Sequence, residues 1–406
     1  MRVTTLLNKL LNLPGLWVRG IRFENDALII EVRRRFRVLT CPECGTRVRG
    51  RFHETTRRWR HLAIWGTPTF LEGPIRRLRC PKCRKVRTEA VPWARHRSAF
   101  TRRFEDVVGL LAQKLDHTAV ASLTGIYWPT VGAIARRLVG EHLHQDRFDN
   151  LRAIGIDEIS YRRHHRYLTI IIDHDRERVI WAGEGKSAET IQGFFDELTD
   201  EQRDSIELVS IDMAKGYVNG VEANLPDATI VFDRFHVARL AQDAVDEVRR
   251  ALMRILDPEG RRFIKRSRWV LLKRPEHLRG SEKAKLDLIR RSNKDLYRAH
   301  LLKETFLDIF EYKAPWRARR ALDAWLAWAQ RSRLEPFVRL ARTVREHLDG
   351  ILAFIGSRLT NARLEGMNNK IRLLSHRAYG FHSAAPLVAT VYLCCSNISL
   401  PEIQLA

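Results

Sequence analysis

Between residues 153 and 233, short apolar runs alternate with segments of helical periodicity, and this order constrains the fold more than any other feature. Short β-branched and apolar runs predict buried strands, whereas apolar residues three to four positions apart predict helices. Predicted strands cover residues 154–157, 167–173, 178–182, 208–212 and 229–233, and predicted helices cover residues 187–198 and 216–223. Three strands, a helix, a strand, a helix and a strand predict a mixed α/β sheet.

Two of these strands end at aspartates, and a third acid lies far downstream. Asp157 ends the run 153–157, Asp212 ends the run 207–212, and Glu365 lies in a basic helical segment. The strand order is that of a ribonuclease-H-like sheet, which sets acids at neighbouring strand ends. Carboxylates suit Mg²⁺ or Mn²⁺, and a pair of such ions promotes phosphodiester chemistry. The alternative is that Asp157 and Asp212 only end strands at turns, which aspartate favours.

Neighbouring acids compete with these three positions. Glu158 directly follows the first acid, so in a strand its side chain points to the opposite face. Asp173 ends the second strand and Asp175 lies in the following turn, and turn chemistry explains both. Asp233 is the strongest rival, because it ends a strand and precedes His236. We predict that Asp233 and His236 lie behind the metal ligands and support them, with a purely structural role as the alternative.

The charge of the chain is strongly positive, with 72 Lys and Arg against 48 Asp and Glu and a formal net charge of +24. This balance predicts a polyanionic partner, because each neutralised phosphate releases a condensed counterion. A membrane surface attracts the same charge, but no apolar run approaches the roughly 18 residues that span a bilayer. Residues 1–14 lack the apolar segment and cleavage site of a signal peptide. We therefore expect a cytoplasmic, nucleoid-associated protein.

Two Cys-Pro-x-Cys pairs lie in the first hundred residues, Cys41 with Cys44 and Cys80 with Cys83. In a basic cytosolic chain such pairs indicate structural Zn²⁺ rather than disulfides, and four thiolates leave no open position for catalysis. Residues 45–79 separate the pairs, a longer interval than usual, which a β-hairpin accommodates. Residues 1–95 are therefore predicted to form a β-rich zinc ribbon, with four unligated buried cysteines as the alternative.

Basic residues of the predicted ribbon suit phosphate contacts. Arg57, Arg58 and Arg60 lie between the two cysteine pairs. Arginine is favoured at such contacts because its planar guanidinium donates two parallel hydrogen bonds to phosphate. A solvated basic face is the alternative.

A helix-turn-helix is predicted within residues 96–148. Ala121, followed four positions later by Gly125, is typical of a small residue where two helices cross and a glycine in the turn. Pro129 suits the first turn of a second helix. That helix directs Arg136 and Arg137 outward and is the candidate for the major groove. An ordinary helical hairpin without a DNA role is the alternative.

A chain of 406 residues, 45% of them hydrophobic, is expected to fold into two to four domains. Besides the two N-terminal domains, we predict a catalytic core of residues 149–240 and 346–390, an α-helical insertion of residues 241–345, and a tail of residues 391–406. The insertion carries Trp269, Trp316, Trp325 and Trp328, which we expect mainly in its core.

Residues 358–381 read RLTNARLEGMNNKIRLLSHRAYGF, residues 155–158 read GIDE, and residues 233–237 read DRFHV. These segments, together with the N-terminal cysteine pairs and helix-turn-helix, resemble the "ISL three" family of bacterial insertion-sequence transposases over nearly the whole chain. The resemblance implies a DDE transposase with a ribonuclease-H-like core interrupted by a helical insertion. It also implies that Asp157, Asp212 and Glu365 are the catalytic acids that bind Mg²⁺ or Mn²⁺.

The same resemblance implies how DNA is bound. The zinc ribbon and helix-turn-helix are expected to bind terminal inverted repeats, and the catalytic core is expected to act on these ends and on target DNA. In DDE enzymes a basic residue lies about two helical turns after the glutamate and contacts phosphate, and Arg372 occupies that position. Further DNA contacts are expected from Arg363, Lys370, His376 and Arg377. Since two ends are joined together, a homodimer or larger synaptic complex is implied.

The predicted function is DNA transposition: hydrolysis frees a 3′-OH at each element end, and this 3′-OH attacks target DNA. Two alternatives remain open. A ribonuclease-H-like nuclease or junction resolvase cuts DNA without strand transfer, and a transposase-derived regulator binds DNA without chemistry. The intact acids favour an enzyme over the regulator.

Overall fold

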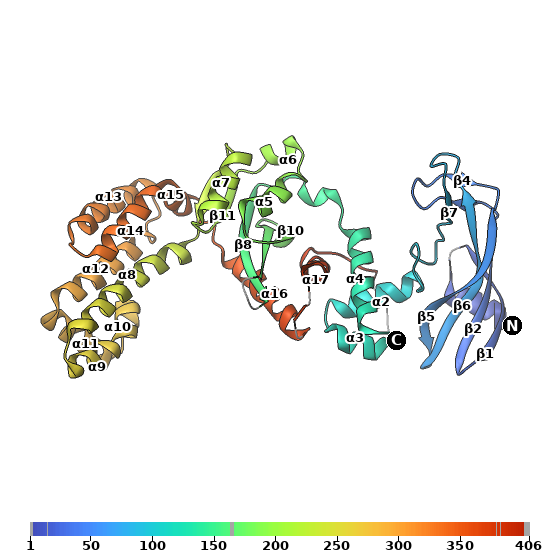
Figure 1. Cartoon of the computed structure of the whole chain (residues 1–406), viewed down its shortest axis with the longest axis horizontal. Coiled ribbons are helices and arrows are strands. Elements are labelled where there is room, and N and C mark those ends of the chain that lie inside the picture. Colours follow the sequence, from blue (N-terminus) through green and yellow to red (C-terminus); the bar gives the residue numbers. More distant parts are fainter. Residues whose placement is uncertain (1–2, 14, 163–165, 379, 382, 402–406) are drawn as a thin grey trace. The chain divides into compact units, whose positions relative to one another are not determined.

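The structure of the chain is a computed structural model that describes residues 3–13, 15–162, 166–378, 380–381 and 383–401. Residues 402–406 of the predicted tail therefore lie outside the described residues. The chain divides into two compact units, residues 1–143 with 397–406, and residues 144–396. Figure 1 shows the helices and strands of both units and labels most of them.

The first unit opens with a five-stranded sheet. Its strands follow the order β1-β2-β6-β5, and β7 pairs with β6. The elements are α1 (Val3–Leu11), β1 (Leu16–Glu24), β2 (Ala27–Arg34), β3 (Leu39–Thr40), β4 (Arg47–Val48), β5 (His53–Ile64), β6 (Thr67–Arg79) and β7 (Val86–Thr88). Strands β5 and β6 form an antiparallel hairpin between the two cysteine pairs, so the predicted hairpin is confirmed. Trp59 and Trp93 meet edge to face in the core, with ring centroids 5.6 Å apart.

Three helices follow in the first unit: α2 (Arg102–Ala112), α3 (His117–Thr124) and α4 (Trp128–His142). Gly125 ends α3 in the left-handed region, with φ of 64°, and its N–H donates to the carbonyl of Ala121. This conformation suits glycine because it has no Cβ. The predicted turn is thus confirmed, and Pro129 lies in the first turn of α4. Leu115 lies beyond the end of α2 and is exposed.

A second five-stranded sheet lies in the second unit. Its strand order is β10-β9-β8-β11-β12, with β11 parallel to both neighbours and β9 antiparallel to both of its own. The elements are η1 (Gln145–Phe148), β8 (Ala153–Arg162), β9 (Arg166–Asp173), β10 (Arg178–Glu184), α5 (Ala188–Phe195), α6 (Asp200–Asp204), β11 (Leu208–Ile211), α7 (Lys215–Asn224) and β12 (Thr229–Phe232). The predicted order is confirmed, apart from the short helix α6, which was not expected.

The two faces of this sheet are covered by different helices. Ile154 and Ile156 join the core to which α5 and α7 contribute, so Gly155 and Asp157 face the other side of β8. Helix α16 (Ala362–Arg377) contacts β8 on that side, and α17 (Ala384–Cys395) contacts β10. The downstream helix that carries Glu365 is therefore brought back to the strand that carries Asp157.

Between β12 and α16 the chain is entirely helical. The elements are α8 (Arg234–Ile255), α9 (Pro258–Lys265), α10 (Arg268–Leu272), η2 (Pro275–His277), α11 (Gly280–Ser292), α12 (Lys294–Ile309), α13 (Pro315–Arg331), α14 (Glu335–Glu346) and α15 (Leu348–Ser357). Trp325 is fully buried, as expected of a core tryptophan, and its indole N–H donates to the carbonyl of Leu302. Trp269 and Trp316 are 64% and 65% exposed, so the core prediction is wrong for these two.

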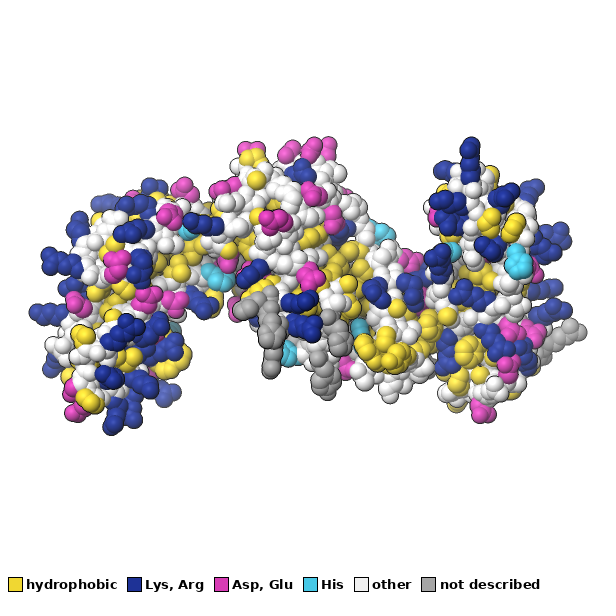
Figure 2. All heavy atoms as spheres, in the orientation of Figure 1, with side chains coloured by type: hydrophobic (Ala, Val, Ile, Leu, Met, Phe, Trp, Pro, Cys, Tyr) yellow, Lys and Arg dark blue, Asp and Glu magenta, His cyan; other side chains and the backbone are white. Residues whose placement is uncertain are grey.

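Lys and Arg side chains spread over both the N-terminal sheet and the helical insertion on the face shown in Figure 2. Among the described residues, we find no helix with both the length and the apolar character needed to cross a bilayer. The positive charge of the surface thus lies on the strands of the first unit and on the helices of the second, as Figure 2 shows.

Candidate functional site

The four cysteines of the N-terminal unit converge. Their sulfur atoms all lie within 4.8 Å of one another, with Cys41 Sγ 4.0 Å from Cys83 Sγ and Cys44 Sγ 3.5 Å from Cys80 Sγ. Four sulfurs bound tetrahedrally to Zn²⁺ at 2.3 Å are about 3.8 Å apart. The observed spacing therefore fits a structural zinc ion with no open coordination position.

Each cysteine pair lies in the same type of backbone turn. The N–H groups of Cys41 and Cys80 donate to the carbonyls of Thr46 and Lys85, and the N–H groups of Gly45 and Arg84 donate back to the carbonyls of Cys41 and Cys80. The Thr46 hydroxyl, 3.1 Å from Cys44 Sγ, lowers the pKa of that thiol to about 6. One ligand is thus already biased toward the thiolate form that binds metal.

In the second unit, Asp157 lies on β8, and Asp212 directly follows the adjacent parallel strand β11. Gly155 is paired with Ser210, and β11 ends one residue before Asp212. Continuing this register places Asp212 level with Asp157, on the same face of the sheet. The prediction that Asp157 ends its strand is wrong, because β8 continues to Arg162 through pairs with β9. The short neighbour β11, not the end of β8, leaves room beside Asp157.

The carboxylate of Asp157 is half-buried and fixed at both oxygens. Oδ1 accepts from the backbone N–H of Glu158 at 2.8 Å, and Oδ2 accepts from Asn368 Nδ2 at 2.6 Å. Burial raises the pKa of Asp157, and repulsion by the Asp212 carboxylate raises it further. Two carboxylates that repel each other are the arrangement that a divalent cation stabilises.

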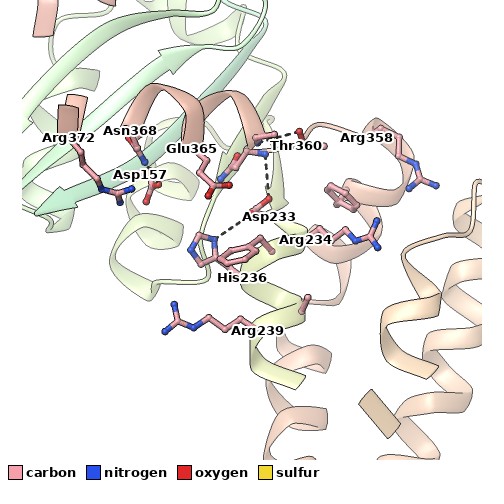
Figure 3. A pocket seen from close by; sticks show the side chains of 15 residues that line it. Asp157, Asp233, Arg234, His236, Arg239, Arg358, Thr360, Glu365, Asn368 and Arg372 are labelled. Atoms are coloured by element: carbon pink, nitrogen blue, oxygen red, sulfur yellow. Dashed lines mark hydrogen bonds and ion pairs between the residues drawn. The ribbon is translucent and has the colours of Figure 1, made fainter. Parts of the chain in front are cut away.

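Helix α16 adds the third acid. Asp157, Glu365, Asn368 and Arg372 line one cavity of about 620 Å³, and Figure 3 shows the α16 side chains beside Asp157. Glu365 lies in the first turn of α16 and is exposed. Three and seven residues separate Glu365 from Asn368 and Arg372, so all three lie on nearly one helix face.

The three acids do not close around a single ion. Within the described part of the chain, the cysteines are the one group of three or more His, Cys, Asp or Glu side chains whose ligand atoms all lie within 4.8 Å. A two-ion site has a looser requirement, because ions about 3.5–4 Å apart allow the outer carboxylates to be further from each other. The arrangement of Asp157, Asp212 and Glu365 is compatible with that looser requirement.

Asp233 and His236 lie together in the wall of the same cavity. Asp233 Oδ2 is 3.3 Å from His236 Nδ1, and Oδ1 accepts from the backbone N–H of Asn361 at 3.4 Å. Asp233 raises the pKa of His236, and Asp157 and Asp212 contribute in the same direction. Asp233 thus joins the start of α8 to the start of α16, and His236 faces the acids, as Figure 3 shows.

The other acids have different environments. Glu158 shares a face of β8 with Ile156, toward α7, although Asp212 and Asp157 still contribute to a raised pKa that is due first to burial. Asp173 accepts hydrogen bonds from the N–H groups of Asp175 and Arg176, which is turn chemistry as predicted.

Sequence reasoning missed Asn361 and Asn368, both of which are buried and line the cavity. Both stand in the motif at residues 358–381, but a buried asparagine has no periodic signal that separates it from an exposed one. The i, i+3 spacing from Glu365 was the available clue to Asn368.

The arginines predicted to bind DNA in the N-terminal sheet already have partners. Arg58 is 2.8 Å from a Glu24 oxygen and 2.5 Å from a Glu72 oxygen, whereas Arg57 donates to the carbonyl of Ser98 at 3.1 Å. The guanidinium of Arg60 lies over the ring of Phe70, and burial lowers its pKa. These contacts position the three side chains within the sheet, and DNA contact stays a prediction.

The two arginines of α4 differ. Arg136 is exposed, whereas Arg137 donates through Nε and Nη2 to Glu105 Oε1, at 2.9 and 2.5 Å. Glu105 is fully buried in α2, so this ion pair holds α4 against α2. Of the two side chains, Arg136 is the more exposed, and contact with DNA stays a prediction for both.

The basic residues of α16 also separate. Arg363 donates to the carbonyl of His174 at 2.6 Å, and Lys370 donates to the carbonyl of Cys394 at 2.6 Å. Arg372 is exposed, lines the acid cavity, and also lines a second cavity of about 290 Å³ with His376. Arg377 is exposed at the end of the helix. Arg372 and His376 are therefore the basic side chains of α16 that line these cavities, and their contact with DNA stays a prediction.

Gly155 lies where β8 packs closely against β11 and His174. A Cβ at this position would lie 2.6 Å from His174 Nε2 and 3.0 Å from Ser210 Oγ, two atoms that are themselves 2.7 Å apart. Burial lowers the pKa of His174 to about 4, so the ring is neutral at pH 7. Any side chain at Gly155 must displace this buried pair.

Gly155→Ala is therefore expected to lower the free energy of unfolding by about 1–3 kcal/mol through overpacking. The measurement is the midpoint of urea unfolding. Gly140→Ala is the control, because a Cβ there meets nothing within 4 Å, and it should leave the midpoint unchanged or raise it. Equal midpoints for Gly155→Ala and the wild type would show that the spacing is not tight.

Comparison with known proteins covers nearly the whole chain. Residues 154–391 match an ISL3 transposase family, residues 89–139 match the helix-turn-helix domain of transposase family ISL3, and residues 37–83 match the zinc finger of the transposases of IS204, IS1001, IS1096 and IS1165. The transposase for insertion sequence element IS1557 of Mycobacterium tuberculosis is 39% identical over 412 residues, covering 93% of this chain and 91% of that protein. The transposase for IS1001 of Bordetella parapertussis is 31% identical over 383 residues, covering 93% and 94% of the two chains. With a zinc ribbon, a DNA-binding helix-turn-helix and a transposase domain in one chain, this protein belongs to the ISL3 family of insertion-sequence transposases.

Proposed function

We propose that this transposase cleaves and joins DNA at the cavity lined by β8, α8 and α16, beside the end of β11, with Asp157, Asp212 and Glu365 as the ligands of two Mg²⁺ or Mn²⁺ ions. The observation that carries the proposal is that Asp157 repels Asp212 across two parallel strands and shares a cavity with Glu365. The strand order β10-β9-β8-β11-β12 supports a ribonuclease-H-like core.

The residues present fit hard divalent cations. Carboxylate and amide oxygens surround the cavity, and no cysteine lines it among the described residues. When bound, Mg²⁺ lowers the pKa of water and stabilises the negative charge that develops on phosphate oxygens. Asp157, Asp212 and Glu365 supply the negative charge that holds the cations, and Asn368 keeps the Asp157 carboxylate in one orientation.

The proposed reaction has two steps at one site. In the first, a water oxygen forms a bond to phosphorus while the bond to the 3′ oxygen breaks, which leaves a 3′-OH on the element end and a 5′-phosphate on the flank. In the second, the 3′ oxygen forms a bond to a target phosphorus and the target's own 3′ oxygen leaves. The number of phosphodiester bonds is unchanged in the second step, so it needs no nucleotide cofactor.

Other residues of the cavity bind and orient the DNA. Arg372, two turns after Glu365, is placed to donate to a phosphate beside the scissile bond. Asp233 holds the ring of His236 in place and, with Asp157 and Asp212, raises its pKa, which favours the protonated ring next to the acids. Exposed cations of the helical insertion, which Figure 2 shows in dark blue, extend this surface for the DNA backbone.

The N-terminal unit is proposed to bind the terminal inverted repeats, with α4 in the major groove and Arg136 directed at the DNA. Two element ends are needed for one insertion, so a homodimer or larger synaptic complex is part of the proposal. The bacterial nucleoid is where we expect this assembly to act.

The test is an assay with purified protein, a labelled element end and a supercoiled target plasmid, with Mg²⁺, Mn²⁺ or EDTA. Metal-dependent 3′ nicking followed by joining to the plasmid is the expected result. Nicking without joining would favour the nuclease, and specific end binding without nicking in either metal would favour the regulator. The discriminating product is the branched plasmid, which hydrolysis alone cannot form.

A further inference from the structure

Asn368 connects the helix of the third acid to the strand of the first. It lies three residues after Glu365 on α16, and its side chain is only 2% exposed. Its Nδ2 donates to Asp157 Oδ2 at 2.6 Å, a short hydrogen bond of the kind formed with a charged acceptor. Rotation of the Asp157 carboxylate therefore breaks this bond.

The other end of the same amide has no partner within the described residues. Asn368 Oδ1 is buried and accepts no hydrogen bond there. The amide cannot simply be turned over, because an ionised carboxylate only accepts and must face the nitrogen. An unpaired buried amide oxygen is unfavourable, so the hydrogen bond from Nδ2 to Asp157 is the interaction that fixes the amide in this orientation.

We infer that Asn368 is a positioning residue of the metal site, whose nitrogen holds the Asp157 carboxylate in the metal-binding orientation. This inference rests on the proposed function of Asp157. Partners that orient a ligand typically change metal affinity by about 10- to 100-fold when they are removed. Asn368 thus acts through Asp157 rather than on the DNA.

A purely structural role predicts something different. If the hydrogen bond only anchored α16 to β8, its loss would lower the melting temperature, but the remaining folded protein would bind metal as before. The affinity for the metal, measured on folded protein, separates the two roles.

The experiment measures binding of Mn²⁺ to the full-length, zinc-loaded protein by electron paramagnetic resonance. Asn368→Leu keeps the shape of the side chain without its donor, and Asn368→Ala removes the donor without added bulk. Both are expected to weaken Mn²⁺ binding by about 10- to 100-fold, with the zinc content and element-end binding unchanged. Nicking should recover as the Mn²⁺ concentration is raised.

Two further variants make the result decisive. Asn224→Ala removes a half-buried asparagine at the end of α7 that bonds to Gln192 on α5 and does not line the acid cavity, and this variant should bind Mn²⁺ like the wild type. Asp157→Asn should lose the site. If Asp157→Asn and the wild type bind equally, the proposed function of Asp157 fails. If Asp157→Asn loses Mn²⁺ while both Asn368 variants stay within about twofold of the wild type, only the role of Asn368 fails.

Discussion

Replacing Asp212 with Asn is expected to abolish both nicking and joining of element ends, lowering the rate by about 10³-fold or more. The substitution keeps the size of the side chain and removes one of the two negative charges, on Asp157 and Asp212, that are proposed to hold the cations. Metal-dependent stabilisation of the transition state is worth several kcal/mol, and each 1.4 kcal/mol is a factor of about ten. The measurement is single-turnover nicking of a labelled end in Mg²⁺.

The matched control for this variant is Asp175→Asn. Asp175 lies in an exposed turn and pairs with Arg152 at 2.8 Å, so its loss should change nicking by less than about twofold, as for other exposed ion pairs. Both variants should bind element ends as tightly as the wild type, because α4 and the ribbon lie in the other unit. Full nicking by Asp212→Asn would remove this residue from the site.

Loss of the zinc ion is expected to unfold the ribbon and abolish end binding. Cys80→Ser removes one of four converging sulfurs, and Cys80 is fully buried beside Leu78. Binding of structural zinc contributes about 10–16 kcal/mol in small zinc domains, more than the ribbon's small hydrophobic cluster can replace. Zinc content, measured by metal analysis, should fall from one ion per chain to none.

The same variant separates the two units. End binding should be lost while the second unit retains its own cooperative thermal transition, because its core contains no zinc ligand. Cys394→Ser is the control: it leaves the four zinc ligands in place and should keep one zinc per chain. Retention of zinc and of specific end binding by Cys80→Ser would contradict the four-sulfur site.

The order of the second sheet was predictable because each apolar run is bounded by polar residues or a turn. At the start of α5, for example, the hydroxyl of Ser187 accepts a hydrogen bond from the N–H of Thr190 and caps the helix. The position of Asp157 was not predictable. Polar residues after it suggested a strand end, yet they pair with β9, and tertiary pairing extends β8 to Arg162.

Long-range partners explain the other differences. The sequence alone indicates no partner for Arg58 or Arg137. In the structure, Arg58 pairs with Glu72, 14 residues away, and Arg137 pairs with Glu105, 32 residues away. No periodicity encodes such pairs. The buried amide of Asn368 is 211 residues from Asp157, so only the folded chain reveals their contact.

Asp157 of β8, Asp212 at the end of β11 and Glu365 of α16 are proposed to share one metal site. Fe²⁺ substituted for Mg²⁺ generates hydroxyl radicals that cut the backbone within a short distance of the ion. We predict that full-length protein with Fe²⁺, ascorbate and peroxide is cut near residues 157, 212 and 365, and that excess Mg²⁺ suppresses all three cuts together. Cuts near only one of these positions, or cuts that persist unchanged in Asp157→Asn, would contradict a shared site.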